Sequence, residues 1–188
     1  SGATSQAQLE QAREAYGRIP LSFEANQGQT DASVNFLARG AGYSLFLKPA
    51  EAVLVLRDAD SGSRVDEGRS VVNPQSEIRN QQSKVLRMKV VGADASAAAE
   101  GVEELGGKAN YLVGDDPSKW RTDVPTYARV SYRAVYPGVD LVYYGNQRQL
   151  EYDFRVAPGA DPRAVSLRFE GADKLDLDAN GDLLLRLG

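Results

Sequence analysis

The chain has 188 residues, a net charge of −4, and 42% hydrophobic and 26% charged residues, which are values typical of one globular domain. It contains neither cysteine nor histidine, so disulfides, thiolate nucleophiles, serine–histidine–aspartate triads and imidazole metal sites are excluded. Acidic and basic residues are interspersed without a basic run, which argues against nucleic acid as a partner. No apolar run approaches the ~20 residues that span a bilayer, so membrane insertion is not expected.

Residues 5–16 predict a short N-terminal helix. Ser5 and Gln8 have the spacing of a capping box, and apolar residues recur at helical intervals behind them. Pro20 prevents the helix from continuing. We expect this helix to pack across one end of the domain.

Three short strands are predicted next, at residues 34–38, 43–47 and 52–57. The breaks between them are of hairpin length and rich in glycine or proline. This pattern predicts a meander, in which each strand pairs with the next. Residues 58–83 are polar and lack periodicity, which is compatible with a linker between domains or a long loop on one domain. The loop is favoured, so a single domain is expected to cover residues 1–188.

A further strand is predicted at residues 84–91. The segment 92–107 is rich in alanine, glutamate and glycine and is compatible with a helical turn. Residues 109–113 predict another strand.

The stretch from Pro125 to Pro162 contains the clearest alternating segments, at residues 139–145 and 150–156. In each of them apolar and polar side chains alternate with the period of two that is typical of a half-buried strand. The linker 145–149 is short and polar, so the two segments predict an antiparallel hairpin.

The C-terminal part predicts one more strand at residues 165–169 and a hairpin over residues 174–187. Asn180-Gly181 lies at the centre of that hairpin, and this dipeptide favours a type I′ turn. In total we expect about ten strands at the spacing of an all-β fold. The predicted fold is a mainly β domain, an antiparallel β-sandwich with a short N-terminal helix.

One candidate metal site lies in the C-terminal hairpin. Asp176, Asp178, Asn180 and Asp182 match the first half of a calcium loop. The last position of such a loop is Leu187 instead of the bidentate glutamate that calcium requires. A polar hairpin tip is the favoured interpretation and calcium is the alternative; no other cofactor is predicted.

A candidate ligand site lies on the outward face of the central hairpin. Asp140, Glu151 and Asp153 are predicted there, and two carboxylates ~5–9 Å apart can act as the acid and the nucleophile or base of a glycosidase. Tyr144 could stack on a sugar ring beside them. Solvated strand faces carry such residues routinely, so a surface without catalysis is the favoured interpretation.

Several phrases of the sequence together carry a family resemblance. They are LSFEANQGQ (21–29), FLARG (36–40), NY (110–111) with DPSKW (116–120), VYPGVDLVYY (135–144), and LEYDF (150–154) with PGADP (158–162). In this combination the chain resembles the N-terminal domain of large bacterial proteins that carry SBBP repeats, which form seven-bladed β-propellers.

The resemblance implies a secreted or cell-surface bacterial protein in which this domain precedes its own propeller repeats. It assigns no catalytic residues. Together with the absent histidine and cysteine, it favours a non-catalytic structural or adhesive module that contacts a protein or glycan at the cell surface. The alternative is a carbohydrate-active module, which binds or hydrolyses glycans through the carboxylates named above.

Overall fold

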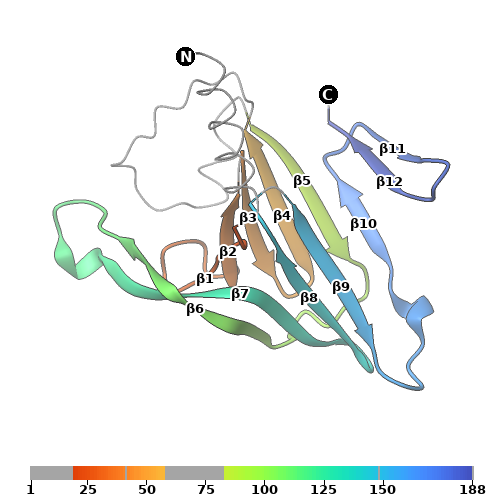
Figure 1. The fold of residues 1–188 in the computed structure, drawn as a ribbon, viewed down its shortest axis with the longest axis horizontal. Helices are drawn as coiled ribbons and strands as arrows, with labels where there is room; N and C mark the ends of the chain where they lie inside the picture. Colours follow the sequence, from red (N-terminus) through yellow and green to blue (C-terminus); the bar gives the residue numbers. More distant parts are fainter. Residues whose placement is uncertain (1–18, 41, 58–82, 148, 188) are drawn as a thin grey trace, which may run out of the picture.

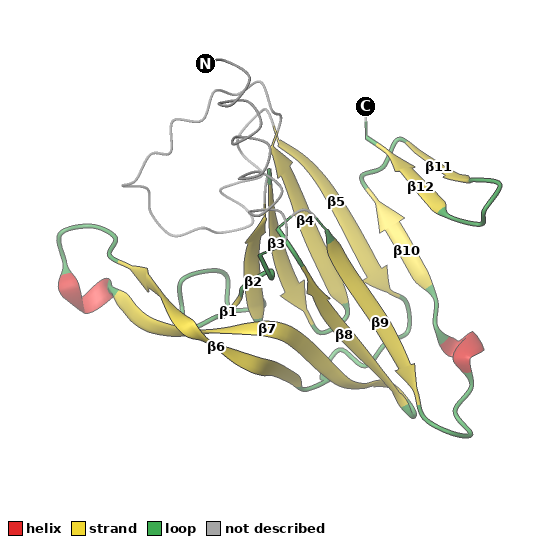
Figure 2. Cartoon of the chain, viewed as in Figure 1, coloured by secondary structure: helices red, strands yellow, loops and turns green. Residues whose placement is uncertain are grey.

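The computed structural model describes residues 19–40, 42–57, 83–147 and 149–187 (Figure 1). This part of the chain contains twelve strands, with all strand pairs antiparallel, and two short 3-10 helices, η1 (Pro117–Lys119) and η2 (Pro162–Ala164) (Figure 2). The prediction of a mainly β, antiparallel fold is therefore confirmed. The helix predicted at residues 5–16 and nearly all of the loop predicted at 58–83 lie outside the described residues.

The strands have the following bounds: β1 Phe23–Ala25, β2 Phe36–Gly40, β3 Tyr43–Lys48, β4 Glu51–Arg57, β5 Ser83–Val90, β6 Ala99–Tyr111, β7 Arg121–Tyr136, β8 Val139–Gly145, β9 Leu150–Val156, β10 Leu167–Glu170, β11 Lys174–Leu177 and β12 Leu183–Arg186. Ten of them form one sheet in the order β10-β5-β4-β3-β2-β1-β7-β8-β9, with β6 paired to β7 beside this path. β11 and β12 form a separate hairpin. The strands thus belong to one continuous sheet and a hairpin, whereas the predicted sandwich has two stacked sheets.

The sheet curls around a single large core. Buried side chains of β2, β3 and β5 pack in the same cluster as those of β7 and β8. Strands from the two ends of the sheet therefore face each other across this core (Figure 1). A smaller apolar cluster, which includes Leu37, Phe46 and Val53, lies on the other face of β2, β3 and β4.

The predicted meander and the predicted central hairpin are both present. β2, β3 and β4 pair consecutively, and β8 pairs with β9 along its whole length. Val139, Leu141 and Tyr143 of β8 point into the core, and Leu150 and Phe154 of β9 pack against it. Alternation in the sequence therefore predicted the buried face of these strands correctly.

The helical turn considered for residues 92–107 is wrong, because β6 runs through most of this segment. β6 pairs with the sixteen-residue strand β7, and pairing overrides the helical preference of alanine and glutamate. Gly101 fits the strand for a steric reason. A Cβ atom at this position would lie 2.5 Å from the ring of Tyr127 on β7, so only glycine lets that ring lie across the pair.

The turn between β11 and β12 also differs from the prediction. The amide of Asp178 donates to the carbonyl of Asp182 at 3.0 Å, which closes a three-residue loop. Gly181 has a φ of +89°, and Asn180 is not among the residues with positive φ. A type I′ turn needs positive φ at both central residues, so the loop is of the kind that ends in a left-handed glycine.

β1 is the strand that joins the two halves of the sheet. Phe23 pairs with Ala38 of β2 on one side and with Tyr127 of β7 on the other. Its side chain is fully buried in the core. The three residues of β1 thereby hold β2–β5 and β7–β9 in one sheet.

Two tyrosines with contrasting hydroxyl groups pack in the core. Tyr132 of β7 and Tyr143 of β8 are fully buried and meet edge to face, with ring centroids 6.1 Å apart. The hydroxyl of Tyr132 donates to Oδ1 of Asn35 at 3.2 Å, whereas that of Tyr143 has no hydrogen-bond partner among the described residues. Burial raises the pKa of both hydroxyls above the usual range.

The two tyrosines predict opposite results for loss of the hydroxyl. Tyr132→Phe is expected to lower the free energy of unfolding by about 1 kcal/mol, because Asn35 loses its donor. Tyr143→Phe is expected to leave it unchanged or to raise it by up to about 1 kcal/mol, because an unpaired buried hydroxyl is removed. Urea unfolding of both variants measures this, and equal destabilisation by the two would show the prediction to be wrong.

Candidate functional site

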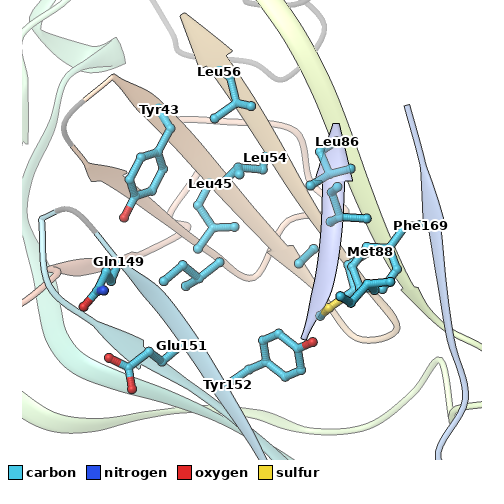
Figure 3. Close-up of a pocket in the computed structure, with 14 residues that line it drawn as sticks. Tyr43, Leu45, Leu54, Leu56, Leu86, Met88, Gln149, Glu151, Tyr152 and Phe169 are labelled. Carbon is cyan, nitrogen blue, oxygen red and sulfur yellow. The ribbon is translucent and has the colours of Figure 1, made fainter. Parts of the chain in front are cut away.

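An apolar groove of about 570 Å³ lies between the two ends of the sheet (Figure 3). Its floor consists of Leu45 of β3, Leu54 and Leu56 of β4, and Leu86 and Met88 of β5. These residues share the inner face because the register places Leu45 opposite Leu54 and Leu54 opposite Leu86. The groove is therefore a direct continuation of the core.

The rest of the lining comes from three other strands. Leu150 and Tyr152 belong to β9, Leu183 and Leu185 belong to β12, and Phe169 of β10 lies beside Met88, its register partner on β5. Tyr152 points into the groove, toward the side that Met88 and Phe169 form (Figure 3). Apart from the tyrosines, the polar residues of the lining are Gln149 and Glu151, and the Glu151 side chain belongs to the outer face of β9. The groove is thus suited to apolar groups and offers no catalytic set.

Backbone groups along β9 border this groove. Asn146 and Gln149 exchange hydrogen bonds at 2.9 and 3.2 Å, and Ala157 donates to Gly138 at 2.8 Å. Between these two ends, every second residue pair of the antiparallel ladder is hydrogen-bonded. The N–H and C=O groups of Glu151, Asp153 and Arg155 therefore point toward β8. The intervening residues direct their N–H and C=O groups away from β8; they are Leu150, Tyr152, Phe154 and Val156.

β10 presents a second free edge. The amide of Val91 donates to the carbonyl of Ser166 at 2.8 Å, so the same alternation directs the backbone of Leu167 and Phe169 away from β5. In the described part of the chain β9 pairs only with β8 and β10 only with β5. The sheet therefore ends in two edges, and the apolar groove lies between them.

Exposed apolar side chains occur on β9 and on the β11–β12 hairpin, and two of them, Tyr152 and Leu183, line the groove. Nine large apolar residues are exposed in the described part of the chain, and six of them belong to β9 or to the hairpin after β10: Tyr152, Val156, Leu175, Leu177, Leu183 and Leu184. Leu177 is 74% exposed. The register places Leu175, Leu177, Leu183 and Leu185 on one face of the hairpin. Exposed apolar side chains beside a groove make this region a candidate interaction surface.

The residues predicted for ligand binding lie on the outer face of the sheet. Asp140, Tyr144, Glu151 and Asp153 share this face of β8 and β9. The Tyr144 hydroxyl donates to Asp153 at 3.0 Å, and this bond is the main cause of a raised pKa of Tyr144. Tyr144 also stacks under the guanidinium of Arg129, 5.6 Å from the ring centroid.

Asp140 has a local structural partner. Its Oδ1 accepts the amide of Ala134 at 2.7 Å, and Ala134 has a φ of +52° within an irregular stretch of β7. The carboxylate therefore stabilises a left-handed residue that would otherwise be unfavourable. The structure brings Tyr144 and Asp153 together, while Asp140 is bound to the bulge.

The residues predicted for calcium lie at the tip and flank of the β11–β12 hairpin. Asp178 Oδ1 accepts the amides of Asn180 and Asp182 at 2.8 and 2.9 Å, and Asp176 forms ion pairs with Lys174 and Arg186. Residues 19–40, 42–57, 83–147 and 149–187 contain no group of three or more side chains suited to a metal ion. A polar hairpin tip stays the favoured interpretation, and calcium binding stays the untested alternative.

We expect calcium to leave the melting temperature unchanged. If calcium bound the folded state alone, it would raise the free energy of unfolding by about 2.7 kcal/mol at a calcium concentration of a hundred times the dissociation constant. Thermal melting with added calcium and with a chelator measures the difference. A rise with calcium that disappears in Asp178→Ala would establish the site.

Sequence reasoning missed a partly buried polar cluster that consists of Glu24 of β1, Arg39 of β2 and Tyr111 of β6. Arg39 Nη1 donates to Glu24 Oε1 at 2.6 Å and to the Tyr111 hydroxyl at 2.9 Å, and Tyr111 donates to the other Glu24 oxygen. Burial and, after it, the charge of Glu24 raise the pKa of Tyr111 above its usual range. The cluster ties β6 to the strand that joins the sheet halves.

Removing the charge of Arg39 alone is expected to lower the free energy of unfolding more than removing the charges of Arg39 and Glu24 together. Arg39→Met is expected to lower the free energy of unfolding by about 2 kcal/mol, because the Glu24 carboxylate, only 12% exposed, loses its counterion. The double variant Glu24→Gln, Arg39→Met is expected to be more stable than Arg39→Met alone. A double variant as unstable as the sum of the two single changes would contradict this account.

Comparisons with known proteins give one match. Residues 23–188 match the model of a family described as "Domain of unknown function (DUF7948)". No curated protein matches, and no solved structure matches. Within the described residues, no helix has the length and apolar character needed to cross a membrane.

Proposed function

We propose that this chain, which belongs to the DUF7948 family, is a non-catalytic structural and adhesive module that contacts partner polypeptides through its groove. The observation that carries the proposal is the apolar groove bordered by the free edges of β9 and β10. Monomeric proteins rarely leave apolar side chains concentrated at one place unless a partner covers them.

The chemistry of the groove supports binding over catalysis. Leucine side chains dominate its lining, together with Met88, Phe169 and two tyrosines. General acid–base and nucleophilic catalysis need titratable or nucleophilic groups that converge on one point. Such convergence does not occur among the lining residues, of which Glu151 alone has a carboxylate.

The resemblance to domains that precede SBBP repeats supports the setting of this module. In the proposal it belongs to a secreted or surface-attached bacterial protein and lies N-terminal to that protein's own propeller repeats. The contacts it makes are with proteins at the cell surface. The interspersed charges and the net charge of −4 make nucleic acid a poor partner.

A carbohydrate-active module is the second candidate, and one observation favours it. Tyr144 lies on the outer face next to Asp153 and Glu151, an arrangement of an aromatic ring beside carboxylates that can bind a sugar. The guanidinium of Arg129 lies over one face of this ring. We rank this candidate lower because Asp140 is occupied by the Ala134 amide.

The groove is tested with a displayed library of random peptides that is selected on the full chain. Leu56→Gln places an amide in the groove and is expected to weaken binding of the enriched peptides about tenfold or more. Leu112→Gln is the matched control, because Leu112 is a 59% exposed leucine outside the groove lining. Circular dichroism verifies that both variants are folded.

Equal binding by Leu56→Gln and Leu112→Gln would show that the groove is not the contact surface. A glycan array and a polysaccharide hydrolysis screen test the second candidate in parallel. Hydrolysis that is lost in Glu151→Gln would overturn the non-catalytic function, whereas no signal in either glycan assay is expected.

A further inference from the structure

We propose that the partner supplies an extended strand that pairs with the free edge of β9 and inserts alternate apolar side chains into the groove. This inference rests on the proposed function, since it names the chemistry of the partner that the groove receives. An exposed strand edge is a template for main-chain pairing, and here the edge and the groove lie together.

The backbone of β9 provides the pairing groups. Leu150, Tyr152, Phe154 and Val156 direct their N–H and C=O groups away from β8. No backbone hydrogen bond beyond the β8 ladder involves these four residues in the described part of the chain. An added strand can therefore form a regular ladder without disturbing any pair already present.

The side chains of β9 determine which residues the added strand needs. Residues directly opposite each other in a ladder place their side chains on the same face. Partner residues opposite Leu150 and Tyr152 would then point into the groove, toward Leu54 and Leu86. The intervening residues would lie on the outer face beside Glu151 and Asp153. The expected partner strand alternates apolar with polar residues, and basic residues are favoured among the polar ones.

A second copy of the chain fits this edge less well. Antiparallel pairing of two β9 strands over their whole length would place Asp153 of one copy opposite Asp153 of the other, although Glu151 would oppose Arg155. The neighbouring register would place Glu151 opposite Asp153. Like charges on neighbouring strands are destabilising. A small apolar ligand could occupy the volume of the groove but would make no use of the free backbone groups of β9. An extended, alternating peptide uses both features.

The experiment uses the peptides enriched on the full chain in the selection above. We expect their sequences to alternate apolar and polar residues, with lysine or arginine among the polar ones. Each enriched peptide is compared with two derivatives that carry N-methyl groups on alternate amides. The two derivatives differ in register, because one is methylated on the odd-numbered amides and the other on the even-numbered amides. One register should weaken binding about tenfold or more, and the other should have little effect, because only one set of amides faces β9.

A pair of variants tests the same point from the protein side. Tyr152→Pro removes an N–H group that β8 does not use, and proline is tolerated where this group faces solvent on an edge strand. Tyr152→Ala removes the same side chain and keeps the N–H. Tyr152→Pro should bind the peptides more weakly than Tyr152→Ala. Slower hydrogen exchange of the Tyr152 amide on binding, measured in the wild-type chain, needs no variant to fold.

The outcomes separate the two proposals. Enriched peptides that lose affinity with Leu56→Gln but not with N-methylation in either register, and that leave the exchange of the Tyr152 amide unchanged, overturn strand addition and leave the groove as the contact surface. Peptides that are insensitive to Leu56→Gln overturn the proposed function itself. A selection that enriches no peptide, or peptides without alternation, overturns strand addition.

Discussion

The whole architecture depends on one short strand that pairs on both sides. β1 contributes only Phe23–Ala25, yet β2 lies along one side of it and β7 along the other. The buried ring of Phe23 fills the core at this junction, and Glu24 connects the same strand to Arg39 and Tyr111. Among the described strands β1 alone pairs with both halves of the sheet, so the halves can curl around a common core while their outer strands stay apart.

The open side of the sheet follows from this arrangement. The strand order ends with β10 on one side and β9 on the other, and an apolar groove lies between them. Natural sheets protect their edges with charged side chains, and β9 has Glu151, Asp153 and Arg155 on its outer face. Its inner face keeps Leu150, Tyr152 and Phe154. An edge protected on one face and apolar on the other limits uncontrolled association, and under our proposal its apolar face receives the partner strand.

The sequence was sufficient for elements defined by local alternation. The period of two in β8 and β9 predicted both the hairpin and its buried face, and the short turns predicted the β2–β4 meander. β6 could not be predicted in this way, because its alanine, glutamate and glycine residues form a strand only through pairing with β7. The Asn180-Gly181 turn was misassigned because Asp178, which accepts two loop amides, selects a three-residue loop.

The groove was beyond sequence reasoning for a different reason. Leu54, Leu86 and Leu150 each read as ordinary core positions of separate strands, and no local pattern shows which strands will be the edges. That property depends on the order of the whole sheet. The predicted carboxylates, by contrast, were correctly placed on an outer face by alternation, although Asp140 turned out to stabilise the backbone at Ala134.

Hydrogen exchange of the β9 amides, measured by NMR on the free chain, tests the open edge most directly. The account predicts slow exchange for Glu151, Asp153 and Arg155, whose amides face β8, and fast exchange for Tyr152 and Phe154, whose amides face away from it. Equal protection of all five amides would mean that another strand already covers β9, and it would contradict the open groove on which the proposed function rests.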